Sequence, residues 1–163
     1  MHKWCLLALV LVVGYFMVVR PTPTPTPMPL TRLEYYDQTT PEQQSLKQLS
    51  CLKNRCLMIY VAPWCPACRS SNPAFLSAVE QLEARGIATF VVIGLDKPEA
   101  LKAYAANFPF PVYLDQKKTF FKELGASRVP YAAVWEPGGK IIMSGSAGFS
   151  SDAALIQHFK LDR

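Results

Sequence analysis

Apolar residues occur in short runs separated by turn-forming residues, and these runs predict the strands. Nearly continuous β-branched and aromatic runs are typical of strands that a parallel sheet buries on both faces. Such runs occupy residues 57–61, 87–95, 112–114 and 131–135, with a short strand expected at 33–36 and a hairpin partner at 140–143. The pattern therefore predicts a sheet with a buried centre.

Helices are predicted where apolar residues recur every three or four positions. The clearest helix covers residues 66–85, where Phe75 and Val79 share one face and Gly86 can end the helix. Another is expected to begin at Thr40-Pro41, a good N-cap and first helical residue, and to end near Leu52. Further helices are expected at 96–107, 117–124 and 153–159. Strands and helices alternate, which is typical of an α/β domain.

Two cysteines, Cys65 and Cys68, lie where the 57–61 strand leads into the 66–85 helix. The first turn of a helix has unpaired N–H groups and a partial positive charge, which stabilise an anion. Cys65 at the tip is the expected thiolate and nucleophile, because disulfide exchange proceeds through the thiolate. Cys68 lies one turn inside, is expected to be more buried, and would resolve the mixed disulfide formed by Cys65.

A zinc site is the alternative for a Cys-x-x-Cys pair, but it needs two further ligands. The candidates Cys51, Cys56 and His158 form no second pair with suitable spacing. The sequence therefore favours a redox pair, with neither a metal nor a cofactor expected.

Cys51 and Cys56 lie in a tight loop before the first core strand. In an oxidising compartment they could form a structural disulfide that closes a short loop. Two alternatives remain open: a second redox relay that feeds Cys65, and two free buried thiols.

The N-terminus consists of a charged start at His2-Lys3 and an apolar run of 16 residues, 4–19. At 1.5 Å per residue this run spans about 24 Å, close to the lower limit for a membrane helix. A cleaved signal peptide is the alternative, although Val18-Val19-Arg20-Pro21 is a poor cleavage junction. Alternating prolines at 21–29 predict a polyproline spacer of about 28 Å. We therefore expect an anchor at 1–20, a linker at 21–30 and one domain at 31–163.

Charge excludes one class of function. The net charge is +5, and residues 1–30 contribute Lys3 and Arg20, so 15 basic and 12 acidic residues, or +3, remain in the domain. Such a mild and scattered excess argues against nucleic acid as a partner.

The stretch from Trp64 to Arg69, Trp-Cys-Pro-Ala-Cys-Arg, together with Pro73, resembles a thioredoxin-superfamily active site. More closely, it is similar to the membrane-anchored TlpA-like thiol–disulfide oxidoreductases of the bacterial envelope. The resemblance extends from about Leu57 to the C-terminus. It implies a thioredoxin-like α/β fold with a mixed central sheet, helices on both faces and one preceding transmembrane helix.

The resemblance also implies further parts of the site. Val129-Pro130 would be a cis bond facing the two cysteines, with the Val129 backbone pairing with a bound substrate strand; otherwise Pro130 simply begins an edge strand in trans. Trp64 would pack over the site, or else be an ordinary surface aromatic. Arg69 would add positive potential near Cys65 or be merely solvated.

By the same resemblance, the partners are protein thiols and disulfides, such as apocytochrome c or other envelope proteins, and a membrane electron donor. The expected location is the bacterial inner membrane, single-pass, with the domain in the periplasm. The competing class is a non-catalytic peptide-binding module in which Cys65 and Cys68 form a permanent disulfide.

Two positions depart from the family pattern. Ile59 occupies the place of the buried acid of thioredoxins, and Ser71 the place where TlpA-like proteins often have a glutamate. The sequence therefore assigns no base to Cys68.

Overall fold

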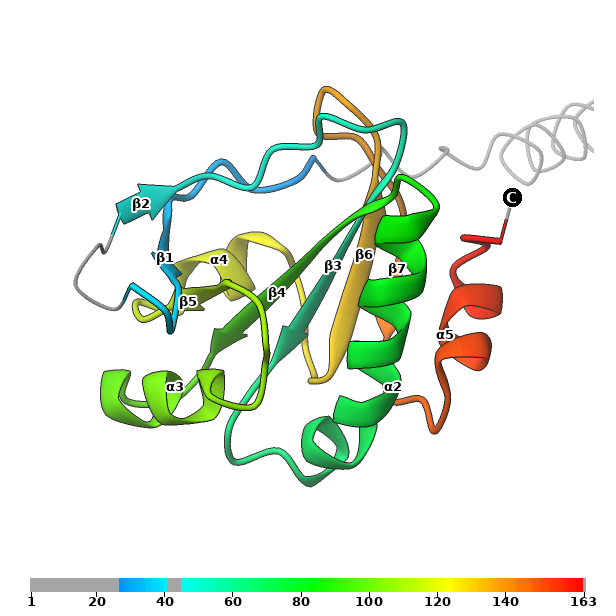
Figure 1. The fold of residues 1–163 in the computed structure, drawn as a ribbon. Coiled ribbons are helices and arrows are strands. Elements are labelled where there is room, and N and C mark those ends of the chain that lie inside the picture. Colours follow the sequence, from blue (N-terminus) through cyan, green and yellow to red (C-terminus); the bar gives the residue numbers. More distant parts are fainter. Residues whose placement is uncertain (1–26, 41–44, 163) are drawn as a thin grey trace, which may run out of the picture.

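The computed structural model describes residues 27–40 and 45–162, which form one seven-stranded sheet covered by helices (Figure 1). The sheet order is β2-β1-β5-β4-β3-β6-β7. The strands are β1 (Leu33–Tyr36), β2 (Ser45–Lys47), β3 (Cys56–Val61), β4 (Ala88–Gly94), β5 (Val112–Asp115), β6 (Tyr131–Trp135) and β7 (Ile141–Ser146). The helices are α2 (Pro66–Ala84), α3 (Pro98–Ala105), α4 (Thr119–Glu123) and α5 (Asp152–His158).

The sheet is mixed, as predicted. The central strand β3 pairs in parallel with β4 and antiparallel with β6. Helices α2, α3 and α5 contribute to the core on one face, whereas α4 and the segment that begins at Met28 cover the other. The predicted α/β fold with helices on both faces is therefore confirmed.

Strand β3 shows why its sequence lacks a polar face. Leu57, Ile59 and Val61 point to the core beneath α2, whereas Met58 and Tyr60 point to the core on the opposite face. Since side chains alternate along a strand, burial on both faces requires apolar residues at nearly every position. The strand that leads to the cysteines is thus the best-buried element of the sheet.

The predicted helix from Thr40 to Leu52 is wrong where the structure describes it. Residues 45–47 form strand β2, which pairs antiparallel with β1 at the sheet edge, and Leu46 is exposed. Backbone pairing with β1 outweighs the weak helical signal, because propensity is easily overridden by tertiary contacts. Thr40, the proposed N-cap, lies in a turn in which its N–H donates to Asp37 O. Residues 41–44 lie outside the described residues.

The fold begins inside the segment expected to be a linker. Met28 is buried, and its N–H donates to Gly139 O at 2.6 Å, while Pro27 forms a bridge with Lys140. The expected anchor at 1–20 lies outside the described residues, and within those residues there is no helix long and apolar enough to cross a membrane. The chain therefore enters the domain along the β6–β7 hairpin.

Candidate active site

Cys65 lies at the junction between β3 and α2, where it is the N-cap residue of the helix. Its backbone is extended (φ −80°, ψ 113°), and its Sγ accepts a hydrogen bond from the Cys68 N–H at 3.1 Å. Pro66 follows at the first helical position, where a missing N–H has little consequence. One of the unpaired N–H groups of the helix is thus aimed at the sulfur, an arrangement that stabilises negative charge on it.

Cys68 is fully buried one turn into α2, as the sequence predicts. Burial raises the pKa of its thiol to about 12, and a hydrogen bond shared with Cys65 acts in the same direction. The backbone of Ala62 and the charge of Arg69 oppose this shift without cancelling it. Cys68 is therefore a protonated thiol at neutral pH.

The peptide bond between Val129 and Pro130 is cis, which confirms the prediction. The carbonyl of Val129 faces the cysteines and accepts a hydrogen bond from the Cys65 thiol at 3.6 Å. The carbonyl of Pro130 accepts from the Ala147 N–H at 3.0 Å, which ties this loop to the end of β7. The cis-proline loop and Cys65, 64 residues apart in sequence, thus form the two walls of one site.

Trp64 is an exposed aromatic residue held by one hydrogen bond, and it does not close the site off from solvent. Its exposed fraction is 56 %, and its indole N–H donates to Leu95 O at 3.0 Å in the loop after β4. Arg69 is also held, because its guanidinium donates to Pro63 O at 2.7 Å. Trp64 immediately precedes Cys65 in the chain, and much of its indole surface is open to a partner.

The two positions that depart from the family pattern are both buried. Ile59 lies in the centre of β3, and Ser71 is 3 % exposed on α2. Neither residue can carry a negative charge, so the structure supplies no carboxylate at either position.

Sequence reasoning missed the pair formed by Tyr104 and Asn72. The Tyr104 hydroxyl donates to Asn72 Oδ1 at 3.2 Å, linking α3 to α2. Burial raises the pKa of Tyr104 to about 12, and the charges of Cys68 and Cys65 add to this shift. The sequence predicts a helix over residues 96–107, which contains Tyr104, but nothing in it showed that this helix packs beside the cysteines.

Comparison with known families now decides the assignment, since a profile described as the AhpC/TSA family matches residues 27–144, more than half of the chain. The chain belongs to the AhpC/TSA family. No curated protein sequence matches it.

Solved structures similar to this AhpC/TSA-family chain are thioredoxin-like. A putative thiol:disulfide interchange protein DsbE from Chlorobium tepidum aligns with a TM-score of 0.65 and 20% identity, over 84% of this chain and 93% of that chain. The thioredoxin domain of a thiol-disulfide oxidoreductase from Bacteroides vulgatus gives 0.65 and 16%, over 87% and 100%. StoA from Bacillus subtilis gives 0.58 and 15%, over 73% and 90%. The resemblance to the thioredoxin superfamily is therefore confirmed at the level of the fold.

Cys51 and Cys56 form a disulfide in this AhpC/TSA-family chain, so the alternative of two free thiols is wrong. Cys56 begins β3, whereas Cys65 follows the end of that strand. The five steps from Cys56 to Val61 alone cover about 17 Å at 3.3 Å per residue. Direct exchange between this disulfide and Cys65 is excluded by that distance, which favours the structural role over a relay.

Proposed function

We propose that this protein is a thiol–disulfide oxidoreductase that exchanges electrons with cysteines of partner proteins through Cys65 and Cys68. The observation that carries the proposal is the position of Cys65 Sγ. It lies at the tip of α2, 3.1 Å from the Cys68 N–H and 3.6 Å from the carbonyl of Val129. A sulfur so placed receives a backbone hydrogen bond at the helix tip, and the neighbouring loop can hold a partner chain.

The chemistry follows from the difference between the two thiols. In the reducing direction, the Cys65 thiolate attacks one sulfur of a partner disulfide, and the other partner sulfur leaves as a thiolate. Cys68 then loses its proton and attacks Cys65 Sγ, so that the Cys65–Cys68 disulfide forms and the second partner thiolate leaves. Two electrons pass from the dithiol to the partner. The oxidising direction is the same sequence reversed.

Turnover in the reducing direction requires a dithiol donor for the Cys65–Cys68 disulfide. We propose a membrane protein for this role and envelope proteins, apocytochrome c among them, as substrates, on the TlpA-like resemblance of the stretch from Trp64 to Arg69. The exposed indole of Trp64 beside the recessed Cys65, which is only 4 % exposed, supports a protein-sized partner.

We propose further that residues 1–20 anchor the protein in the bacterial inner membrane with the domain outside the cytoplasm. The position of Pro27 supports this proposal. Pro27 pairs with Lys140 at the tip of the β6–β7 hairpin, and this tip lies at the Cys56 end of β3, since Cys56 is opposite Trp135. An anchor that entered here would leave Cys65, at the other end of β3, facing away from the membrane.

The binding-module alternative requires a permanent Cys65–Cys68 disulfide. Both cysteines are free thiols in this structure, so no observation favours that alternative.

Trapping of mixed disulfides tests the proposal. A Cys68→Ser variant keeps the nucleophile but cannot resolve, so we expect it to accumulate covalent complexes with partner proteins in cells. Non-reducing electrophoresis and mass spectrometry would detect and identify these complexes. A Cys65→Ser variant is the matched control and should trap at most a small fraction as much. Equal trapping by the two variants, or none by Cys68→Ser, would refute the proposed function.

A further inference from the structure

Resolution of the mixed disulfide needs a thiolate on Cys68, yet the usual acidic neighbours are replaced by Ile59 and Ser71. We propose that Tyr104 is the positioning residue for this step: its hydroxyl turns from Asn72 and donates a hydrogen bond to the Cys68 thiolate as it forms. The inference deepens the proposed function and rests on it, because it concerns the same pair of cysteines.

The hydrogen bond to Asn72 shows how near the Tyr104 hydroxyl lies to the cysteines. Asn72 follows Cys68 by four residues on α2, so the two side chains lie on the same face, one turn apart. The hydroxyl lies 3.2 Å from Asn72 Oδ1. The Tyr104 side chain is buried and belongs to the same core cluster as Cys65 and Cys68. The Tyr104 hydroxyl therefore lies beside the face of α2 that carries Cys68, one helical turn from that residue.

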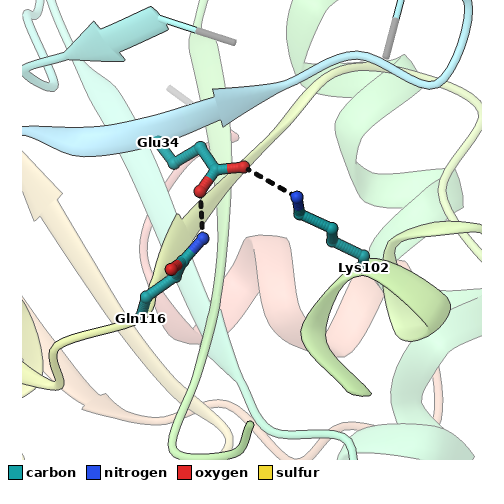
Figure 2. A network of polar contacts seen from close by, with 3 residues as sticks. All are labelled: Glu34, Lys102 and Gln116. Atoms are coloured by element: carbon teal, nitrogen blue, oxygen red, sulfur yellow. Dashed lines mark hydrogen bonds and ion pairs between the residues drawn. The ribbon is translucent and has the colours of Figure 1, made fainter. Parts of the chain in front are cut away.

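Helix α3, which carries Tyr104, is itself held in place by polar contacts with neighbouring residues. Figure 2 shows Lys102 of α3 pointing at Glu34 of β1, with Nζ and Oε1 3.6 Å apart, while Gln116 after β5 donates to the other oxygen of the same carboxylate. The Gln38 side chain donates to Ala105 O at 3.1 Å, at the end of α3. These contacts bind α3 to β1 and to the loop after it, which keeps Tyr104 beside α2.

The protonation state of Tyr104 decides which role its hydroxyl can have. Burial and the charges of the cysteines raise the pKa of Tyr104 to about 12, so the phenol keeps its proton at neutral pH. The charged or titratable groups that act on it are Cys68, Cys65 and Arg69, with no carboxylate among them. A phenol in this state cannot act as the base for Cys68. It can donate a hydrogen bond, and a bond to an anion is about twice as strong as one between neutral groups.

The step balances without another cofactor. The Cys68 proton leaves to solvent, and the Tyr104 hydrogen shifts its hydrogen bond from Asn72 Oδ1 to Cys68 Sγ. The Cys68 thiolate then attacks Cys65 Sγ, the new sulfur–sulfur bond forms, and the bond from Cys65 to the partner breaks. The partner sulfur leaves as a thiolate with the electron pair, and the Tyr104 hydroxyl returns to Asn72.

Reaction with 5,5′-dithiobis(2-nitrobenzoic acid) separates the two steps. The reagent forms a mixed disulfide at Cys65 and releases one thionitrobenzoate at a rate that depends on reagent concentration. Resolution by Cys68 then releases a second thionitrobenzoate at a rate that does not. Stopped-flow absorbance of the full chain in detergent would follow both, in a Cys5→Ser background that leaves Cys65 and Cys68 as the only cysteines outside the Cys51–Cys56 disulfide.

Tyr104→Phe removes only the hydroxyl. We expect it to slow the second release about tenfold at pH 7 and to move the pH midpoint of that release upward by about one unit, which is the same change in free energy. Asn72→Ala should leave the second release at least as fast as in the unsubstituted chain, because it frees the hydroxyl. Tyr113→Phe is the matched control, since Tyr113 is a half-buried phenol in β5 whose pKa is also raised by burial, and it should change nothing.

An unchanged second release in Tyr104→Phe would overturn the inference. A loss of rate with an unmoved pH midpoint, or an equal loss in Asn72→Ala, would also overturn it by showing that the pair acts only through packing. Thermal unfolding of each variant verifies that it is folded. Failure of the proposed function has a different signature, because Cys65 would then show no rapid first release and no exchange with a protein disulfide.

Discussion

Cys65 and Cys68 lie three residues apart in one helical turn and yet differ in chemistry. Cys65 Sγ receives a backbone hydrogen bond at the helix tip, while Cys68 is fully enclosed and its pKa is raised to about 12. A raised pKa in a thiol means that the neutral form persists to higher pH, so Cys68 stays protonated from acidic pH to well above pH 9. This difference supports the proposed roles, in which Cys65 attacks the partner disulfide and Cys68 resolves the mixed disulfide.

Alkylation measures this difference directly. In a Cys65→Ser variant, we expect iodoacetamide to modify Cys68 at pH 7 at least tenfold more slowly than free cysteine, with the rate rising toward pH 12, because burial remains the main cause of the raised pKa. Peptide mass spectrometry after timed quenching would report the rate. The Cys68→Ser variant is the control in which Cys65 should react readily. Modification of Cys68 at pH 7 as fast as free cysteine would contradict the assignment.

Strand β3 separates two sulfur sites by its own length. Its first residue, Cys56, forms a disulfide with Cys51. Its last residue, Val61, leads toward Cys65. The disulfide fastens the loop after β2 to the central strand, at the end where Trp135 and Met28 are buried in the same cluster. The Cys51–Cys56 disulfide thus lies at one end of β3, and the proposed site of exchange, Cys65 and Cys68, lies beyond the other end.

Removal of the clamp should affect stability and leave exchange intact. We expect the double variant Cys51→Ala, Cys56→Ala to lose about 2 kcal/mol of unfolding free energy, the value for a short closed loop. Urea titration would measure this loss. The rate of the first thionitrobenzoate release at Cys65 should stay within about twofold of the unsubstituted chain, since the length of β3, about 17 Å, lies between the two sites. A large loss of exchange in a folded double variant would revive the relay.

At the scale of the whole molecule, the chain enters the domain at one end of the sheet, and Cys65 lies at the other end. Figure 1 shows the first described residues beside the β6–β7 hairpin, while the start of α2, which carries Cys65, lies at the opposite end. Met28 is buried among core residues, so the point of entry is fixed rather than loose. A tether attached there would present the cysteines to partners away from the surface that holds it.

Fractionation tests the proposed anchor. We expect the full chain to sediment with membranes and to resist carbonate extraction, because an apolar run of 16 residues at 4–19 is close to the length of a membrane span. A variant with Leu11→Arg and Val13→Arg should instead be released, since charged residues inside a span are unfavourable. A full chain that is extracted by carbonate, or whose N-terminus begins after Arg20, would show that no anchor is retained.

The sequence by itself predicted the central sheet and the helix behind Cys65, because continuous apolar runs and a proline at the first helical position are local signals. The cis bond at Val129-Pro130 was predicted by the resemblance to the thioredoxin superfamily, and the structure confirms it. The sequence left the structural disulfide between Cys51 and Cys56 as one of three alternatives. Two cysteines five positions apart can lie close together without being bonded, and only the structure shows the bond.

Tertiary structure alone decided the features that depend on distant partners. Residues 45–47 form a strand because their backbone pairs with β1. Met28 is a core residue because its backbone is hydrogen-bonded to Gly139 in the β6–β7 hairpin. Tyr104 and Asn72 meet because α3 packs beside α2, across 32 residues of sequence. A pattern of residues reports its own periodicity and local chemistry, but which surfaces meet is set by the packing of the whole chain.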